Sequence, residues 1–302
     1  MSRSSNNCVA IGLGARAVAV GVRASRYERL RALNLPRRIG MRVPDAAQPA
    51  EQMLPRANIA MADDQCFSEE GAFNVLRQAL ESEASASNRR LNSTRRAFIV
   101  LDDFWANHAI LCGDFRRVRA REVDEIARAH FSDNFGLDGD SLSVRSMVQR
   151  GGKALFSSAI SRALQDGIHA VAASERVEVK SLTLGLPRTL NRLRVAVGGG
   201  AAMLLVMTQT HLHAVLIDRN CWVAYDTHRV FPADADDASR LAAIAERIFE
   251  RASNSRREDC MVYLCGLDVD PTVFERRFAG AQHLPGPAMG VSPELHLMGL
   301  AQ

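Results

Sequence analysis

Three short apolar runs in the C-terminal half of the chain place the strongest limit on its fold. They span Ala202–Gln209, Leu212–Ile217 and Cys221–Thr227, and only three polar residues separate the second run from the third. Runs of this length bounded by turn residues predict β-strands, and so short a turn predicts that the last two strands pair antiparallel. We therefore expect an antiparallel meander in this half of the chain.

Helical periodicity around these runs indicates an α+β fold. Leu241, Ile244 and Ile248 share one face of a predicted helix over Asp237–Ala252, and a second predicted helix begins just after Cys66. Of the 302 residues, 47% are apolar and 24% are charged, which is the composition of a soluble globular protein. No apolar run reaches the roughly 18 residues that a membrane-spanning helix needs.

Charge and composition divide the chain into three parts. Residues 1–43 hold nine arginines against one acidic residue, although the net charge of the whole chain is only +4. Such a basic start can be an organelle presequence, a nucleic-acid arm, a secretion or packaging signal, or a solvated extension. We predict a basic N-terminal extension over residues 1–45, one domain of catalytic size over 46–275 and a flexible tail over 276–302.

Two further sequence features concern nucleotides and redox state. The segment Gly12–Ala17 matches the G-x-G-x-x-A dinucleotide fingerprint, which needs a strand–helix–strand unit and an acidic residue about 20 positions later. Arg23–Arg42 offers neither cleanly, so we do not expect a bound nucleotide. The six cysteines lack CxxC spacing, which favours a reducing, intracellular compartment over a disulfide framework.

Asp226 and His228 are the residues best placed for chemistry, because alternation along a strand puts them on one face. A carboxylate beside an imidazole fixes its tautomer and leaves the other ring nitrogen to act as a base. Cys66 is the candidate nucleophile, since an imidazolium and a helix N-terminus both stabilise a thiolate. Either Gln52 or Gln65 could supply an amide to the oxyanion, and spacing alone does not choose between them.

This pattern resembles the deubiquitinase domain at the N-terminus of herpesvirus large tegument proteins and the tegument-like deubiquitinases of some bacteria. That family has a Gln-Cys-x-Ser-Asn stretch, matched here by Gln65–Glu69, and an Asp-Pro-His stretch, matched here by Asp226–His228. The resemblance covers roughly residues 50–270. It implies a papain-like cysteine protease with a central antiparallel sheet flanked by helices, and it assigns the oxyanion to Gln52.

The implied activity is removal of ubiquitin from conjugates. Cys66 would attack the carbonyl of the C-terminal glycine of ubiquitin, His228 would transfer the proton, and Asp226 would orient His228. The resemblance implies no cofactor and no metal, and its partners are ubiquitin and ubiquitinated host proteins; we expect no membrane or nucleic-acid partner. The implied location is the host cell cytoplasm, from a virion tegument or as a delivered bacterial effector. Four carboxylates are expected to line the channel for the ubiquitin tail: Asp63, Asp64, Glu69 and Glu70.

Three alternatives remain open. Zinc needs three or four convergent nitrogen or sulfur ligands. His211 and His213 share a strand face, but Cys221 and His228 point to opposite faces of their strand, so we do not expect zinc. A second alternative is an interaction or structural protein whose basic N-terminus docks a partner, with Asp226 and His228 as a hydrogen-bonded pair. A third keeps the cysteine chemistry and changes the substrate.

Overall fold

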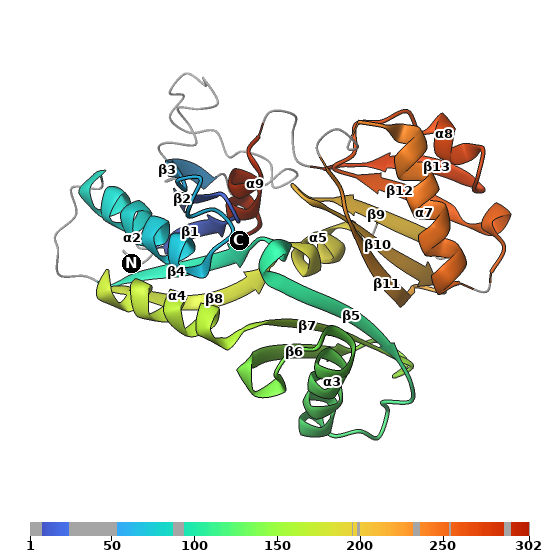
Figure 1. The fold of residues 1–302 in the computed structure, drawn as a ribbon, viewed down its shortest axis with the longest axis horizontal. Coiled ribbons are helices and arrows are strands. Elements are labelled where there is room, and N and C mark those ends of the chain that lie inside the picture. The colour runs from blue at the N-terminus through green and yellow to red at the C-terminus, as the bar shows by residue number, and fades with distance from the viewer. Residues whose placement is uncertain are drawn as a thin grey trace, which may run out of the picture. The chain divides into compact units, whose positions relative to one another are not determined.

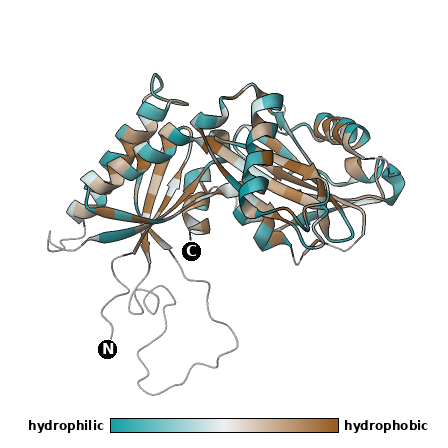
Figure 2. Cartoon of the chain, turned by 90° about the horizontal axis from the view of Figure 1, so that it is seen from below, coloured by the Kyte–Doolittle hydropathy of each residue, from teal (hydrophilic) through white to brown (hydrophobic). Residues whose placement is uncertain are grey.

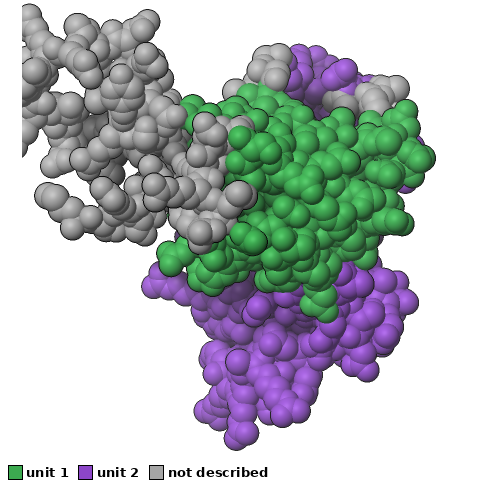
Figure 3. Space-filling model, turned by 90° about the vertical axis from the view of Figure 1, so that its left-hand side faces the viewer, with its two compact units in different colours: residues 1–102, 166–185, 291–302 green, residues 103–165, 186–290 purple. Residues whose placement is uncertain are grey.

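The chain folds into two compact units (Figure 3). The structure, a computed structural model, describes residues 8–23, 53–86, 94–194, 196–197, 200–231, 236–253, 255–286 and 291–301. Unit 1 comprises residues 1–102, 166–185 and 291–302, and unit 2 comprises residues 103–165 and 186–290. Each unit is therefore built from segments that lie far apart in the sequence.

Unit 1 holds a five-stranded mixed sheet in the order β3-β2-β1-β4-β8 (Figure 1). Strands β1, β2 and β3 pair antiparallel, whereas β1, β4 and β8 run parallel. The central strand β1 is an almost continuous apolar run, as expected of a strand that is covered on both faces. The elements of this unit are β1 (Cys8–Leu13), β2 (Ala17–Arg23), β3 (Met53–Ala60), α2 (Glu69–Ala86), β4 (Arg95–Leu101), α4 (Arg162–Ser174, whose first turn belongs to unit 2), β8 (Val177–Leu184) and α9 (Pro293–Leu300).

Unit 2 repeats the same strand pattern in a second sheet, β11-β10-β9-β12-β13. Its first three strands pair antiparallel, and β9, β12 and β13 run parallel. The two sheets therefore share one topology, with the first strand of each in the middle. The elements are α5 (Gly185–Leu193), β9 (Ala202–Met207), β10 (His211–Asp218), β11 (Cys221–Arg229), α7 (Ala238–Ala252), η4 (Arg257–Asp259), β12 (Met261–Cys265), α8 (Thr272–Glu275) and β13 (Gly280–Leu284).

An insertion between β4 and α4 forms a third, smaller sheet, also in unit 2, with the strand order β5-β7-β6. Helix α3 packs on β6 and β7 and buries Phe131 and Ala127. Strand β5 also contacts β11, so the insertion lies against the larger sheet of unit 2. Its elements are η2 (Asp103–Trp105), β5 (Ala106–Cys112), α3 (Ala120–Phe135), η3 (Gly139–Ser141), β6 (Leu142–Val148) and β7 (Ala154–Ser161).

Helices cover the sheets through apolar faces, and Figure 2 shows hydrophobic residues concentrated in the strands. In unit 2, α7 buries Leu241, Ile244 and Ile248 against the larger sheet. In unit 1, α9 contacts β1, β2, β3 and β4, and its Leu297 and Met298 pack against alanines of the first two strands. No helix in the described ranges is long and apolar enough to cross a membrane.

The fold confirms some of the sequence predictions. The meander is β9–β10–β11, the predicted helix over residues 237–252 is α7 with Asp237 as its N-cap, and a helix begins just after Cys66. The single antiparallel sheet flanked by helices is wrong, because two of the three sheets are mixed in direction.

The predicted ends of the chain also differ from the structure. Residues 1–45 contain β1 and β2 of the unit 1 sheet, and residues 276–302 contain β13 and α9. Two of the nine arginines, Arg16 and Arg23, fall in the described ranges. A role for the basic segment as a whole therefore stays a prediction.

Candidate functional site

The predicted nucleophile lies in unit 1. Cys66 is half-buried in the turn before α2, and its Sγ lies 4.0 Å from the main-chain oxygen of Met61. Ser68 of the same motif caps the helix, because its hydroxyl accepts a hydrogen bond from the Gly71 N–H at 3.0 Å. The same hydroxyl donates to the main-chain oxygen of Gln65 at 2.7 Å. The Gln-Cys-x-Ser segment thus has a structural role in starting α2.

The predicted base and its partner lie in unit 2. Asp226 forms an ion pair with Arg251 of α7 and accepts the Thr227 N–H at 2.8 Å, while His228 is exposed. The structure shows no hydrogen bond between Asp226 and His228 in this described strand. Because Cys66 belongs to the other unit, its pairing with His228 stays a prediction.

The remaining predicted residues that the structure describes lie in the same segment as Cys66, before and at the start of α2. Gln52 lies outside the described residues, and Gln65 is in the turn that precedes α2. Of the four carboxylates expected to line a channel, Glu69 and Glu70 form the first turn of α2, and Asp63 and Asp64 are exposed. No group of three or more His, Cys, Asp or Glu side chains that could hold a metal ion occurs in the described ranges.

A buried polar network in unit 2 was not foreseen from the sequence. Asp103 and His108 are each at most 5% exposed, and the Asp103 Oδ1 lies 2.9 Å from the His108 Nε2. The His108 Nδ1 lies 2.8 Å from the Ser158 hydroxyl, and the second Asp103 oxygen accepts the Leu186 N–H at 2.7 Å. Burial closes this serine–histidine–aspartate set to a substrate, so its hydrogen bonds hold η2, β5, β7 and the start of α5 together.

A second histidine extends this network toward the larger sheet. His213 of β10 is 2% exposed, and its Nδ1 lies 2.9 Å from the Tyr225 hydroxyl. Burial lowers the pKa of His213 to about 4, with Asp103 opposing the shift and His108 and His211 adding to it. Burial likewise raises the pKa of Tyr225. Both groups are therefore neutral at physiological pH.

The turns at the carboxyl ends of the parallel strands are where nucleotide phosphates would bind, since ligands of open α/β sheets bind at that edge. In unit 1 this is the β1–β2 turn, Gly14–Arg16. The Gly14 N–H donates to the Ala17 main-chain oxygen at 2.9 Å. The Glu294 Oε1 lies 2.7 Å from the position that a Cβ on Gly14 would take, and Glu294 is 4% exposed. A buried carboxylate thus lies against the turn that would hold a phosphate.

The β1–β2 turn is also fixed by its other contacts. The guanidinium carbon of Arg16 lies 5.3 Å from the ring centroid of Phe67. The Phe67 N–H donates to the Ala15 main-chain oxygen at 2.9 Å, and the Met61 N–H donates to that of Arg16 at 2.7 Å. These hydrogen bonds use the main-chain oxygens of Ala15 and Arg16 and fix the shape of the turn, while the buried Glu294 carboxylate beside Gly14 opposes a phosphate there.

The equivalent turn of unit 2, Thr208–Thr210, is polar, but it uses its hydroxyls internally. The Thr208 hydroxyl donates to the His211 main-chain oxygen at 3.1 Å and accepts the His211 N–H at 3.3 Å. The Thr210 hydroxyl lies 2.8 Å from the His211 Nδ1. Neither Gly14–Arg16 nor Thr208–Thr210 itself contains an Asp or Glu, and the carboxylate beside the first turn is that of Glu294.

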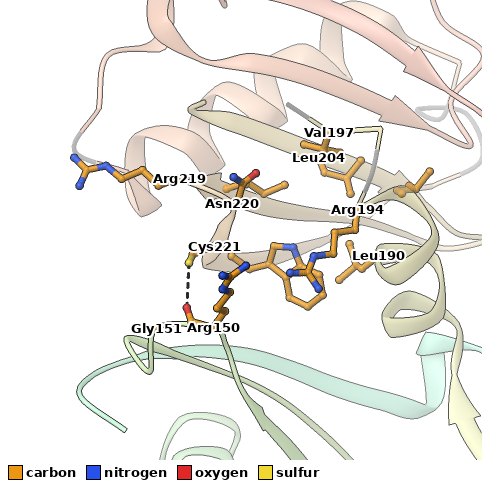
Figure 4. A pocket seen from close by; sticks show the side chains of 12 residues that line it. Arg150, Gly151, Leu190, Arg194, Val197, Leu204, Arg219, Asn220 and Cys221 are labelled. Carbon is orange, nitrogen blue, oxygen red and sulfur yellow. Dashed lines mark hydrogen bonds between the residues drawn. The ribbon is translucent and has the colours of Figure 1, made fainter. Parts of the chain in front are cut away.

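Unit 2 has an open pocket of about 440 Å³, which is the size of a small ligand site (Figure 4). Its floor is apolar and its rim carries three arginines. The walls come from the β6–β7 turn, from α5 and the residues after it, and from the strands and turns of β9, β10 and β11. The lining residues are Arg150, Gly151, Leu190, Leu193, Arg194, Val197, Leu204, Ile217, Arg219, Asn220, Cys221 and Trp222.

Comparisons with known proteins show the fold and no family. No protein-family model matches the chain, and no curated protein matches it. The structure of the PilM-PilN type IV pilus biogenesis complex aligns with a TM-score of 0.60 at 11% identity over 98% of this chain and 98% of that chain. A Bacteroides thetaiotaomicron protein described as having an actin-like ATPase fold and unknown function aligns with a TM-score of 0.58 at 7% identity, over 93% and 92%.

A third solved structure is the cytoplasmic domain of EpsL, an inner membrane component of the type II secretion system of Vibrio cholerae. It aligns with a TM-score of 0.50 at 10% identity, over 97% of this chain and 92% of that chain. At these identities the likeness establishes the architecture alone.

These findings overturn the protease assignment. The papain-like fold, the tegument deubiquitinase resemblance, the cysteine protease activity and the ubiquitin partners are wrong. The comparisons give no support to the alternative of an interaction or structural protein with a basic N-terminal arm. The expected location in a host cell stays a prediction. The physical reason for the error is that Gln-Cys-x-Ser and Asp-x-His are short motifs that here serve helix capping and an ion pair. The chain has an actin-like ATPase fold.

Proposed function

We propose that this chain is a partner-binding subunit of a multiprotein assembly, and that it does not turn over ATP. The observation that carries the proposal is Glu294 of α9, whose buried carboxylate lies against the Gly14 turn. A phosphate there would meet a like charge in a site shielded from water, where electrostatic repulsion is strong.

The architecture of the solved neighbours supports this proposal. Two of the structures that align over nearly the whole chain belong to assemblies, the PilM-PilN complex of type IV pilus biogenesis and the EpsL component of a type II secretion system. By analogy with these two proteins, which belong to multiprotein assemblies, we expect this chain to bind a partner protein. The Bacteroides thetaiotaomicron protein, which is described as having an actin-like ATPase fold and unknown function, makes ATP binding the alternative to test.

The test compares thermal unfolding of the full chain with and without magnesium-ATP, together with phosphate release. A nucleotide at about 100 times its Kd stabilises a protein by about 2.7 kcal/mol, which is easily seen as a rise in Tm. We expect no rise and no phosphate release, both for the natural chain and for Arg145→Ala, a surface control in β6 outside the turn. A saturable rise in Tm or steady ATP turnover would show that the chain is a nucleotide-dependent protein.

The carboxylate can be tested directly. Glu294→Gln keeps the size of the side chain and removes its charge. If the charge is what excludes phosphate, this variant gains affinity for magnesium-free ATP relative to the natural chain. A natural chain that binds ATP as well as the variant does would contradict the reasoning.

A further inference from the structure

The pocket of unit 2 is built as a binding site, with a fixed wall between the insertion and the larger sheet. The side-chain amide of Gln149 donates to the Trp222 main-chain oxygen at 2.7 Å and accepts the Trp222 N–H at 2.8 Å. Next to it, the Cys221 Sγ lies 3.6 Å from the Arg150 main-chain oxygen (Figure 4). These contacts hold the β6–β7 turn against β11, so the pocket is largely formed before a ligand arrives.

The floor of the pocket is apolar. Leu190 and Leu204 are each 2% exposed and Ile217 is 7% exposed, so they form a packed surface beneath the opening. The Trp222 ring packs edge-on against Phe156, with ring centroids 5.4 Å apart. A floor of this kind accommodates a bulky aliphatic or aromatic group.

The rim is strongly basic. Arg150, Arg194 and Arg219 are exposed, and none of the twelve lining residues is acidic. Arg219 lies 4.0 Å from Asp218, an exposed contact that water and salt screen. Arg150 and Arg194 form no ion pair within the described ranges. The guanidinium groups therefore remain available for carboxylates, which they bind in a two-pronged geometry.

We propose that this pocket binds an acidic peptide segment of a partner protein, with one large apolar side chain on the Leu190–Leu204 floor and carboxylates on the arginine rim. Arginine and tryptophan are the residues that most often dominate binding at protein interfaces, and both are present here. A single apolar floor suits one anchoring side chain better than a run of stacked bases, which needs several exposed aromatic faces. The inference rests on the proposed function and names its partner class.

The experiment selects binders to the full chain from a phage-displayed library of random dodecapeptides, and measures the selected peptides by fluorescence polarisation. We expect peptides in which Asp or Glu flank a large apolar residue. Arg150→Glu and Arg194→Glu should each weaken binding at least about tenfold, because each loses a charge-assisted contact and gains a repulsion. The matched control is Arg145→Glu, an exposed arginine of β6 outside the pocket, which should change affinity less than about twofold.

The assignment would be overturned by the absence of an enriched peptide, by an enriched motif without acidic residues, or by equal weakening in the control variant. If an oligonucleotide at the same concentration of negative charge displaces the bound peptide, the pocket is a general polyanion-binding surface, and the assignment is overturned. Circular dichroism verifies that each variant is folded. A failure to bind acidic peptides would overturn this assignment without affecting the test of ATP binding. ATP turnover would overturn the proposed function, but a measured peptide affinity would still hold.

Discussion

The buried histidine of β10 predicts a specific loss of stability in mild acid. In the folded chain the pKa of His213 falls from its usual 6.5 to about 4 because the ring is buried. Between these two values the unfolded chain binds the proton and the folded chain does not, so stability is full above pH 6.5 and is lost as pH falls toward 4. At about pH 5 this one residue costs about 2 kcal/mol of unfolding free energy relative to neutral pH.

The assay is urea unfolding of the natural chain and of His213→Gln, each at neutral pH and at about pH 5. Glutamine keeps one donor and one acceptor near Tyr225 and Thr208 but has no titrating group. His213→Gln is expected to be less stable than the natural chain at neutral pH, because it packs less well. Between the two pH values it should lose about 2 kcal/mol less than the natural chain.

A matched control separates this effect from a general effect of acid. His169→Gln removes an exposed histidine of α4, so it should follow the natural chain at both pH values. Equal losses in the natural chain and in His213→Gln would refute the claim that a neutral buried imidazole makes the fold acid-sensitive.

Three further predictions concern packing. Arg95→Leu leaves the 1%-exposed Glu83 carboxylate without its partner and should cost about 3 to 5 kcal/mol in urea unfolding. Gly12→Ala places a Cβ closer to the Glu294 main-chain oxygen than such atoms can approach, so it should lower the free energy of unfolding by about 1 to 3 kcal/mol. Its control is Gly299→Ala, whose Cβ meets nothing within 4 Å and which should leave stability unchanged or raise it. Burial raises the pKa of Cys260 to about 12, so its thiol should react with Ellman's reagent only after unfolding.

The part of the fold that sequence reasoning predicted is the part set by local pattern. The meander and α7 follow from apolar periodicity and from the turn at Asp218–Asn220, all within one stretch of chain. The pairing of β1 with β4 joins residues almost 90 positions apart, and no residue pattern in either strand indicates which strand it pairs with. The shared topology of the two sheets therefore could not be predicted, because their sequences carry no visible repeat.

The site was harder to predict for a related reason. Asp226 and His228 lie on one strand as expected, but the ion pair of Asp226 with Arg251 depends on how α7 packs. Asp103, His108 and Ser158 meet only because the insertion folds back on itself, and no spacing in the sequence marks them. The segment Gly12–Ala17 has the residue spacing of the dinucleotide fingerprint, but it is followed by a second strand where the fingerprint requires a helix.

The position of α9 in the chain has a consequence for synthesis in the cell. Unit 2 is encoded within residues 103–290, so it can complete its fold as soon as that stretch has left the ribosome. Strands β1 and β2 come earlier in the chain than unit 2 and must wait for α9 to cover Ala10 and Ala19. A nascent chain that stops before α9 would expose this apolar face, so unit 1 can complete its core only after α9 has been made.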